Sequence, residues 1–596
     1  MIERNYNTEE LPLDANLEKF AIPYSPEKFT REEKKYLKPF FTNVDKPIYA
    51  SHNLPEEVTG ALSSRYSRAT KSLRRMFIDE YIKAIVEPES QKDWEKMKWS
   101  QKKRSLRTRD NFKEWIDHMN QTGGIDDVVN VQRGRDFFGK WLAEYGDDSI
   151  AEMGGVHLFI EGASNIAVNE IESKRIGLSP LEKSSRYVQF WEKRKDGQFQ
   201  YVIPGELKGT PEEELFKDAM DRLFETYKGI SDGYKEYIRE TYPKAEDEEE
   251  RPYDRAISAK RFDDIRDLLP FSTQTSVALH GNGRAFEDLI NRMAAHPIGE
   301  VRWVGQQMHR ELSKIVPSFV TRPASERGAE MQLYRTNMEV LREELAGKLK
   351  EKKKNRNSRW VKLDRFTKDP ELEVLSAFLF KASTSLTLEE IKKQVSNWNE
   401  KKIKKAFDAI FAERNFGKDD PPRQEVRFRK VPRAFENAEF VYDVWGRAGD
   451  FRDLHRHRQM TQERQKFTTK WGYDLEDEVI NSPFKEQITS ALENAADAFK
   501  AISEKNPWVA QYLIPFAYLQ HWYINATARE IYWISELRTG PQGREHYRQI
   551  CQDIARQAID AAPNLFSGIK IDWDSHPISR RESEKKIEKK LKELNS

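Results

Sequence analysis

The chain has 596 residues, and its 101 basic side chains nearly cancel its 99 acidic ones, which leaves a formal net charge of +2. This length exceeds what one hydrophobic core organises, so we expect two large domains. The near-neutral balance excludes a global field that would draw the protein to nucleic acid or to an anionic membrane, and we expect neither as a partner.

The N-terminal segment MIERNYNTEELPLDANLEKF lacks the basic start and apolar run of a signal peptide, and no stretch approaches a membrane-spanning length. We therefore expect a cytoplasmic protein. The single cysteine, Cys551, excludes a disulfide framework and a Cys-based zinc site. Ile550 and Ile554 recur around it at helical spacing, so we interpret it as a packed helix residue. We assign no metal ligands.

In chain order, the first strand-like run is SIAEMGGVHLFIEG (149–162), which contains Glu152 and is followed by the basic motif Ser173-Lys174-Arg175. A second run, AFENAEFVYDVWG (434–446), contains Glu436 and is followed by the basic motif Arg456-His457-Arg458. Two similar blocks in the same order indicate an internal repeat.

The clearest repeat places LLPFSTQTSVALHGNGRAFEDLINRMAAHP (268–297) over LIPFAYLQHWYINATAREIYWISELRTGPQ (513–542). Pro270 to Arg284 is 14 residues, as is Pro515 to Arg529. A further arginine follows each, Arg292 at +8 and Arg538 at +9, and an apolar helical pattern continues in both. We expect both arginines to lie on helices.

Charged stretches separate these blocks. The acidic run KAEDEEERPYDR (244–255) and the basic run GKLKEKKKNRNSRWVK (347–362) are typical of solvated connections. We predict copy 1 at 1–345 with an acidic insertion at about 205–255, a basic linker at 346–365, copy 2 at 366–570, and a charged tail at 571–596 that forms a frayed or solvent-exposed helix.

The ordered set resembles the core of the flavin-dependent thymidylate synthase (ThyX) family. In that family Ser/Thr-x-x-Glu precedes a strand, a helix, the signature R-H-R and then S-x-x-E-x-S-x-R-Y. The first copy keeps Ser179, Glu182, Ser184, Arg186 and Tyr187, but has Ser173-Lys174 where Arg-His would stand. The second keeps Arg456, His457 and Arg458, but has Arg464, Lys466 and Thr468 at the Glu, Ser and Arg positions. Each copy has kept what the other lost.

The resemblance implies an α+β fold with two tandem ThyX-like domains, each an antiparallel sheet packed with long helices. It also implies reductive methylation of dUMP to dTMP with methylenetetrahydrofolate, FAD and NADPH, at sites shared between the copies of a homodimer that holds four ThyX-like units. Two alternatives stay open. In the first, the chain is a ThyX-fold enzyme that modifies another uracil nucleotide. In the second, it is a non-catalytic relative that binds nucleotide or flavin.

Carried over residue by residue, the resemblance assigns roles to the following positions. The flavin would be bound by Arg456, His457, Arg458, Ser149, Glu152, Asn282, Arg284, His296 and Arg529. The dUMP would be bound by Glu182, Ser184, Arg186 and Arg292, and the catalytic residues would be Arg292 and Arg538. Arginine suits both tasks, because its planar fork donates paired hydrogen bonds to phosphate and its fixed charge stabilises an anion that develops on a ring.

These assignments have plainer rivals. The alternative for Glu182 to Arg186 is a surface loop with an incidental arginine, and the alternative for Arg292 is one partner in a helix-surface ion pair. His457 has a rival interpretation as an exposed member of a basic run.

Overall fold

The computed structural model describes residues 12–87, 90–122, 131–138, 148–186, 188–246, 248–350 and 359–595. The chain forms two compact units, and each of them is built from segments that are not contiguous in the sequence. Unit 1 comprises Met1–Asp221, Phe271–Lys352 and Asn506–Tyr512, and unit 2 comprises Arg222–Pro270, Lys353–Lys505 and Leu513–Ser596. Each unit thus contains a segment from the other half of the sequence: residues 222–270 belong to unit 2, and Asn506–Tyr512 to unit 1.

The sheet of unit 1 has four strands in the order β1-β2-β4-β3, namely Ile48–Ser51, Gly155–Ser164, Gln274–Asn282 and Leu178–Glu182. All neighbouring pairs are antiparallel. The register of β2 against β4 shifts between Glu161 and Ala163, where Gly162 takes a φ of 79°. Glycine adopts this left-handed conformation without steric cost, so Gly162 accommodates the bulge.

The sheet of unit 2 repeats this topology with β5 Trp360–Phe366, β6 Glu439–Arg447, β8 Leu519–Thr527 and β7 Thr461–Arg464, in the order β5-β6-β8-β7. All of its pairs are also antiparallel. The predicted α+β fold with two tandem antiparallel sheets is therefore confirmed.

The repeat predicted from the sequence coincides with structural elements. β4 and β8 are separated along the chain by the same distance as Pro270 and Pro515, and each runs directly into a helix, α12 Gly283–Ala294 or α24 Ala528–Arg538. Asn282 caps α12 through its side chain, which accepts from the backbone N–H of Ala285, and Thr527 caps α24 in the same way through the N–H of Glu530. The prediction that Arg292 and Arg538 lie on helices is confirmed.

The other helical elements in the segments of unit 1 are η1 Pro12–Asp14, η2 Glu18–Phe20, α1 Arg31–Leu37, α2 Glu56–Tyr66, α3 Leu73–Phe77, η3 Ile78–Ile82, α4 Lys83–Val86, α5 Gln91–Lys96, α6 Trp99–Gln121, α8 Val131–Phe138, η5 Asp148–Met153, α9 Asn165–Glu172, α13 Gly299–Leu312, α14 Pro317–Val320, η7 Arg322–Ala324, α15 Glu326–Ala346 and α23 Pro507–Ala510. Two elements, α10 Pro211–Thr241 and η9 Gln511–Leu513, run from one unit into the other.

Those of unit 2 are α11 Glu250–Ile265, η6 Arg266–Leu268, α16 Pro370–Phe380, α17 Leu388–Val395, α18 Glu400–Arg414, α19 Arg423–Val426, η8 Arg433–Asn437, α20 Ala448–Leu454, α21 Asp477–Ile480, α22 Lys485–Ser503, α25 Glu545–Ala561 and α26 Arg581–Asn595.

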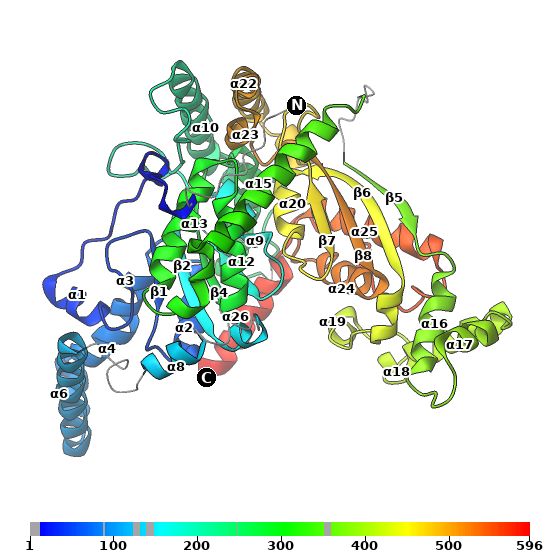
Figure 1. Cartoon of the computed structure of the whole chain (residues 1–596), viewed down its shortest axis with the longest axis horizontal. Coiled ribbons are helices and arrows are strands. Elements are labelled where there is room, and N and C mark those ends of the chain that lie inside the picture. Colours follow the sequence, from blue (N-terminus) through cyan, green and yellow to red (C-terminus); the bar gives the residue numbers. More distant parts are fainter. Residues whose placement is uncertain are drawn as a thin grey trace. The chain divides into compact units, whose positions relative to one another are not determined.

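Helices lie against each sheet (Figure 1), and most residues of the central strands are buried. In unit 1, α13 packs on β1 and β2, while α9 and α12 pack near β4. In unit 2, α25 lies along β5 and β6, and α24 follows β8. Cys551 lies fully buried on α25, which confirms it as a packed helix residue, and burial raises the pKa of its thiol to about 12. No helix in the described parts of the chain has the length and apolar character that a membrane crossing requires.

The prediction of a solvated connection at 244–255 holds only in part: residues 244–246 and 249–251 are exposed, but the run enters helix α11 and buries side chains there. Glu250 begins α11, which buries Tyr253 on its first turns, and Glu248 is itself buried. Arg581 at the start of α26 donates from Nε to Glu248 at 2.9 Å. The charged tail therefore forms a helix that packs on α11, because its basic side chains neutralise the acidic run.

The predicted linker, 346–365, overlaps strand β5 at its C-terminal end, and its residues 351–358 lie outside the described part of the chain. Trp360 packs edge-on against Trp445 of β6 at 5.1 Å between ring centroids, and Val361 is buried. These apolar contacts make a strand of a segment whose composition is basic. The predicted copy boundaries describe the sequence repeat and stay a prediction.

Candidate functional site

His457, in the turn after α20, lies between two charged side chains of α24. Its Nδ1 is 3.1 Å from Oε1 of Glu530, and its Nε2 accepts a hydrogen bond of 2.9 Å from Nε of Arg538. Because a guanidinium only donates, Nε2 of His457 is the acceptor, and Nδ1 carries the proton that is donated to Glu530. Two residues predicted for the site, His457 and Arg538, are thus in direct contact.

Burial lowers the pKa of His457 below its ordinary value; the hydrogen bond to Glu530 opposes this effect without cancelling it, and the nearby Arg538 charge adds to it. The imidazole is therefore neutral at pH 7. With 5% of the residue exposed, the interpretation of His457 as an exposed member of a basic run is wrong. Its neighbours differ: Arg456 is exposed and Arg458 is half-buried.

The same ion pair occurs in both units. Three of its four residues, Arg284, Glu152 and Arg529, are predicted to bind flavin, and Glu436 is the repeat counterpart of Glu152. In unit 1, NH1 of Arg284 is 2.7 Å from Oε1 of Glu152. In unit 2, NH1 of Arg529 is 2.8 Å from Oε1 of Glu436. Each pair joins the turn before the second strand in the sheet order, β2 or β6, to the first turn of the helix that follows the third strand, β4 or β8. This conserved geometry within one chain is the structural counterpart of the sequence repeat.

Two further predicted flavin ligands lie at this end of the unit 1 sheet. Oδ1 of Asn282 accepts a hydrogen bond of 2.8 Å from the backbone N–H of Ala285 and thereby caps α12. Ser149 is exposed in η5, three residues before Glu152. Asn282, Arg284, Glu152 and Ser149 therefore belong to one neighbourhood in unit 1.

Arg292 and His296 converge on Glu170 of α9. NH2 of Arg292 is 3.7 Å from Oε2 of Glu170 and also donates to its backbone carbonyl, and Nε2 of His296 is 3.9 Å from the same carboxylate oxygen. The ring of His296 packs edge-on against Trp508 at 5.5 Å. Both side chains thus contact the same carboxylate, although α12 ends before His296.

Arg292 and Arg538 are not structural equivalents. Since α12 and α24 begin in the same register, Arg292 corresponds to Leu537, and Arg538 lies one position further along its helix. One residue turns a helix by about 100°, so the two arginines point in different directions. This explains why Arg292 contacts α9 and Arg538 contacts His457.

The predicted phosphate-binding residues lie at the end of β3 and in the turn that follows. Glu182 is the last residue of β3 and is buried. Ser184 and Arg186 are half-buried, and the backbone N–H of Arg186 lies 3.4 Å from Oγ of Ser184. The backbone N–H of Ser184 donates to Ser67 at 2.9 Å, which fixes the turn against the N-terminal region. Tyr187 lies outside the described residues.

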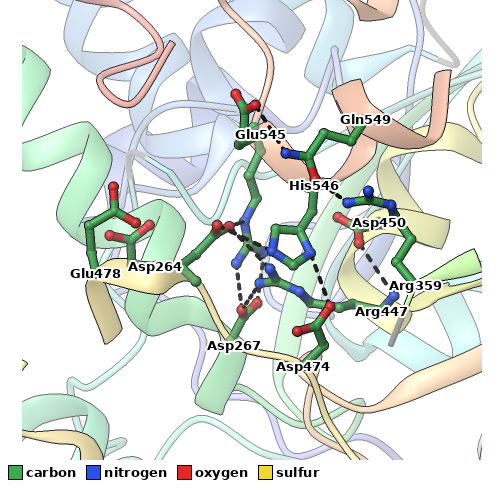
Figure 2. A network of polar contacts seen from close by, with 12 residues as sticks. Asp264, Asp267, Arg359, Arg447, Asp450, Asp474, Glu478, Glu545, His546 and Gln549 are labelled. Atoms are coloured by element: carbon green, nitrogen blue, oxygen red, sulfur yellow. Dashed lines mark hydrogen bonds and ion pairs between the residues drawn. The ribbon is translucent and has the colours of Figure 1, made fainter. Parts of the chain in front are cut away.

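Sequence reasoning missed a buried charge cluster in unit 2, drawn in Figure 2. Oδ2 of Asp267 accepts from NH1 of Arg447 at 2.6 Å, and Oδ1 accepts from NH1 of Arg544 at 2.7 Å. Nε of Arg544 donates to Glu476 at 2.9 Å. Asp267 comes from the first half of the sequence and the arginines from the second. The exchanged segment 222–270 therefore supplies the anion for two buried cations.

Burial controls ionisation around this cluster. Burial raises the pKa of Asp450, which lies one helical turn beyond Arg447, to about 6. Burial alone would also raise the pKa of Glu476, but His546, Arg447 and Arg544 outweigh it and hold the pKa of that carboxyl well below its ordinary value. Glu476 thus stays ionised beside the arginines.

Unit 1 contains a counterpart at the equivalent positions. Glu300 accepts from the backbone N–H and hydroxyl of Ser164 at 2.8 and 2.7 Å, and from the hydroxyl of Tyr512 at 2.5 Å. Tyr512 occupies the repeat position of Asp267, and Ser164, like Arg447, is the N-cap of the helix after the second strand. The offset between Pro270 and Pro515 aligns Asp267 with Tyr512, so the repeat relates the two positions, although it does not state which unit each one joins.

Comparison with known proteins places both halves of the chain in one family. The model of the family "Thymidylate synthase complementing protein" matches residues 96–318 and 367–564. A UPF0159 protein of Chlamydia muridarum is 33% identical over 562 residues, which cover 93% of this chain and 98% of the relative. One from Chlamydia pneumoniae is 31% identical over 94% of this chain and 98% of the relative. One from Thermoplasma acidophilum is 27% identical over 76% of this chain and 92% of the relative.

Proposed function

Because the chain belongs to the thymidylate synthase complementing protein family, we propose that it is a flavin-dependent thymidylate synthase-like enzyme. It converts dUMP to dTMP by reductive methylation with methylenetetrahydrofolate, FAD and NADPH. The observation that carries the proposal is the family match in both halves, combined with the complementary distribution of signature residues. Ser184 and Arg186 stand in one copy, and Arg456 to Arg458 stand in the other.

The residues of the second copy fit a flavin through their chemistry. Arg456 and Arg458 offer guanidinium donors, which suit the diphosphate of FAD. His457 has both ring nitrogens engaged, so we assign it to orienting Arg538 rather than to binding the cofactor. Bound in its reduced form, FAD would supply the hydride for the reaction.

Arg538 is the strongest candidate for stabilising the pyrimidine. Its contact with His457 uses Nε, so the terminal nitrogens are the donors that would bind a ring oxygen of the substrate. A guanidinium held in place by a neutral histidine stabilises negative charge on the ring as it develops. Arg292 is held by Glu170, and we assign it to binding the substrate in the other copy.

We assign the phosphate of dUMP to the turn after β3. Ser184 offers a hydroxyl and Arg186 a guanidinium, two donors that suit a phosphate dianion. Since these residues and Arg456 to Arg458 come from different copies, the proposal includes sites shared between copies and a homodimer.

Purified protein tests the proposal in two steps. Flavin absorbance of the purified chain comes first, followed by tritium release from dUMP labelled at ring carbon 5 with all cofactors present. Arg538→Gln should abolish release while leaving the flavin bound. Arg342→Gln, on an exposed side chain of α15, is the matched control and should leave both unchanged.

The outcomes separate the alternatives. A chain that modifies no uracil nucleotide, whether or not it binds flavin, supports the non-catalytic relative. A yellow chain that releases no tritium from dUMP, but modifies another uracil nucleotide, supports a changed acceptor. Growth of a thymidine-requiring strain on this gene without thymidine supports thymidylate synthesis directly.

A further inference from the structure

A row of polar side chains crosses the sheet of unit 1. Ser51 of β1 is paired with His157 of β2, His157 with His280 of β4, and His280 with Ser179 of β3. Residues directly opposite each other in an antiparallel sheet project from the same face. The two histidines are therefore cross-strand neighbours on the two central strands.

The geometry brings a third group to this pair. The imidazole rings of His157 and His280 are stacked with centroids 4.4 Å apart and planes 15° from parallel. Oε2 of Glu56, in the first turn of α2, is 2.8 Å from Nε2 of His157. One ligand atom from each of the three residues lies within 4.8 Å of the other two.

We propose that Glu56, His157 and His280 bind a divalent transition-metal ion of the Zn²⁺ class, with water completing the coordination. Two imidazoles and one carboxylate form a ligand set that holds zinc with an open position. Imidazole ligands favour Zn²⁺ and its first-row neighbours over Mg²⁺ and Ca²⁺, which prefer oxygen. This site is separate from the residues assigned to the proposed function.

The surroundings allow the ligands to close on an ion. The Glu56 side chain is 79% exposed and is therefore able to change rotamer, whereas that of His157 is 15% exposed and held by the sheet. Zinc–nitrogen and zinc–oxygen bonds are about 2.0–2.2 Å long, so an ion would draw the three groups together by small side-chain rotations. The ion would fasten the start of α2 to strands β2 and β4.

The sheet of unit 2 lacks this ligand set at the corresponding row. There Arg365 is paired with Val441, Val441 with Asn525, and Asn525 with Thr461. The chain itself thus suggests replacements that its own fold accepts, His157→Val and His280→Asn.

A second cluster, Asp572, Asp574 and His576 in unit 2, serves as the internal control. These three residues lie in one loop. Nη2 of Arg548 is 3.5 Å from Oδ1 of Asp572, so the guanidinium already compensates part of the negative charge of this cluster. Asp574→Asn tests whether any metal bound by the chain is held there instead.

The experiment uses the full chain, freed of metal with a chelator and titrated calorimetrically with ZnCl₂. We expect one site in the wild type and in Asp574→Asn. In His157→Val and His280→Asn, affinity should fall at least about tenfold, since losing a direct ligand costs no less than losing the groups that orient one. Co²⁺ should give the intense visible bands of a four-coordinate site in the wild type and lose them in His280→Asn.

Thermal unfolding without metal shows whether the variants fold, and we expect only a small change because Val and Asn occupy the corresponding positions in the sheet of unit 2. Zn²⁺ affinity that is equal in His280→Asn and wild type overturns the proposal, as does a loss confined to Asp574→Asn. Thymidylate synthesis is measured separately, so failure of the metal site leaves the proposed function standing.

Discussion

Replacing Asp267 with Asn would remove the shared anion from two buried arginines. The side chains of Asp267, Arg447 and Arg544 are 3%, 0% and 2% exposed, and the oxygen–nitrogen distances are 2.6 Å to Arg447 and 2.7 Å to Arg544. Removing one partner of a buried ion pair costs about 3–5 kcal/mol, because the remaining charge stays desolvated. Glu476 still compensates Arg544 at 2.9 Å, and Asn keeps one acceptor oxygen. We therefore expect a loss near the lower end, about 3 kcal/mol.

Glu152→Gln provides the matched control. The Glu152–Arg284 pair has a similar oxygen–nitrogen distance, 2.7 Å, but its side chains are 49% and 54% exposed. Exposed pairs contribute at most about 1 kcal/mol, because water already solvates both charges. The two variants thus change the same chemical group at similar distances and differ in burial.

Urea denaturation followed by tryptophan fluorescence measures both variants. Trp445 and Trp522 are buried in unit 2 and report its unfolding, while Trp303 reports unit 1. The loss in Asp267→Asn should appear in the transition that unit 2 reports. If Asp267→Asn and Glu152→Gln lower the free energy of unfolding equally, burial does not set the strength of these pairs and the reasoning fails.

Asp450→Asn should raise the free energy of unfolding at pH 7.5 by up to about 3 kcal/mol. Burial raises the pKa of this carboxyl from 3.8 to about 6 in the folded state, so at pH 7.5 the folded wild type holds a buried ionised group that is less stable than in the unfolded chain. The gain should shrink as pH falls from about 6 to 4, where the folded wild type takes up the proton before the unfolded chain does; a gain constant over pH 4–7.5 would contradict this origin. His457→Leu should lower kcat more than it lowers flavin affinity, as steady-state rates and flavin titration would show, because Arg538 loses the acceptor that orients it. Tyr512→Phe should destabilise unit 1 by about 1–3 kcal/mol in thermal unfolding, because the buried carboxylate of Glu300 loses a donor; an unchanged midpoint would show that the hydroxyl is dispensable.

The sequence repeat predicted the local structure well. The shared spacing from Pro270 to Arg284 and from Pro515 to Arg529 corresponds to a strand followed by a helix in both units. It also placed Glu152 and Glu436 at equivalent positions, where each pairs with its arginine. These features are local, because turn, cap and helix start lie within a few residues of one another.

Long-range features were harder to predict. The repeat did not reveal that Asp267 lies in unit 2, since nothing in a segment's own pattern states which sheet it joins. The acidic run at 244–255 looked solvated because its partner, Arg581, lies far along the chain. The one-residue difference between Arg292 and Arg538 was visible in the sequence, but its consequence depends on helix geometry. Composition alone therefore underestimates burial of charge that distant residues neutralise.

The exchange of segments constrains how the chain is made. Translation delivers residues 222–270 before the rest of unit 2 exists, and Asn506–Tyr512 long after the other strands and helices of unit 1. Neither unit has its full set of segments until the ribosome has passed residue 512. A break in the basic stretch between β4 and β5 would leave each fragment lacking a piece of one unit and carrying a piece of the other. We therefore expect each half of the chain, expressed alone, to lack a segment that its main unit uses, and the two halves to fold better together than apart.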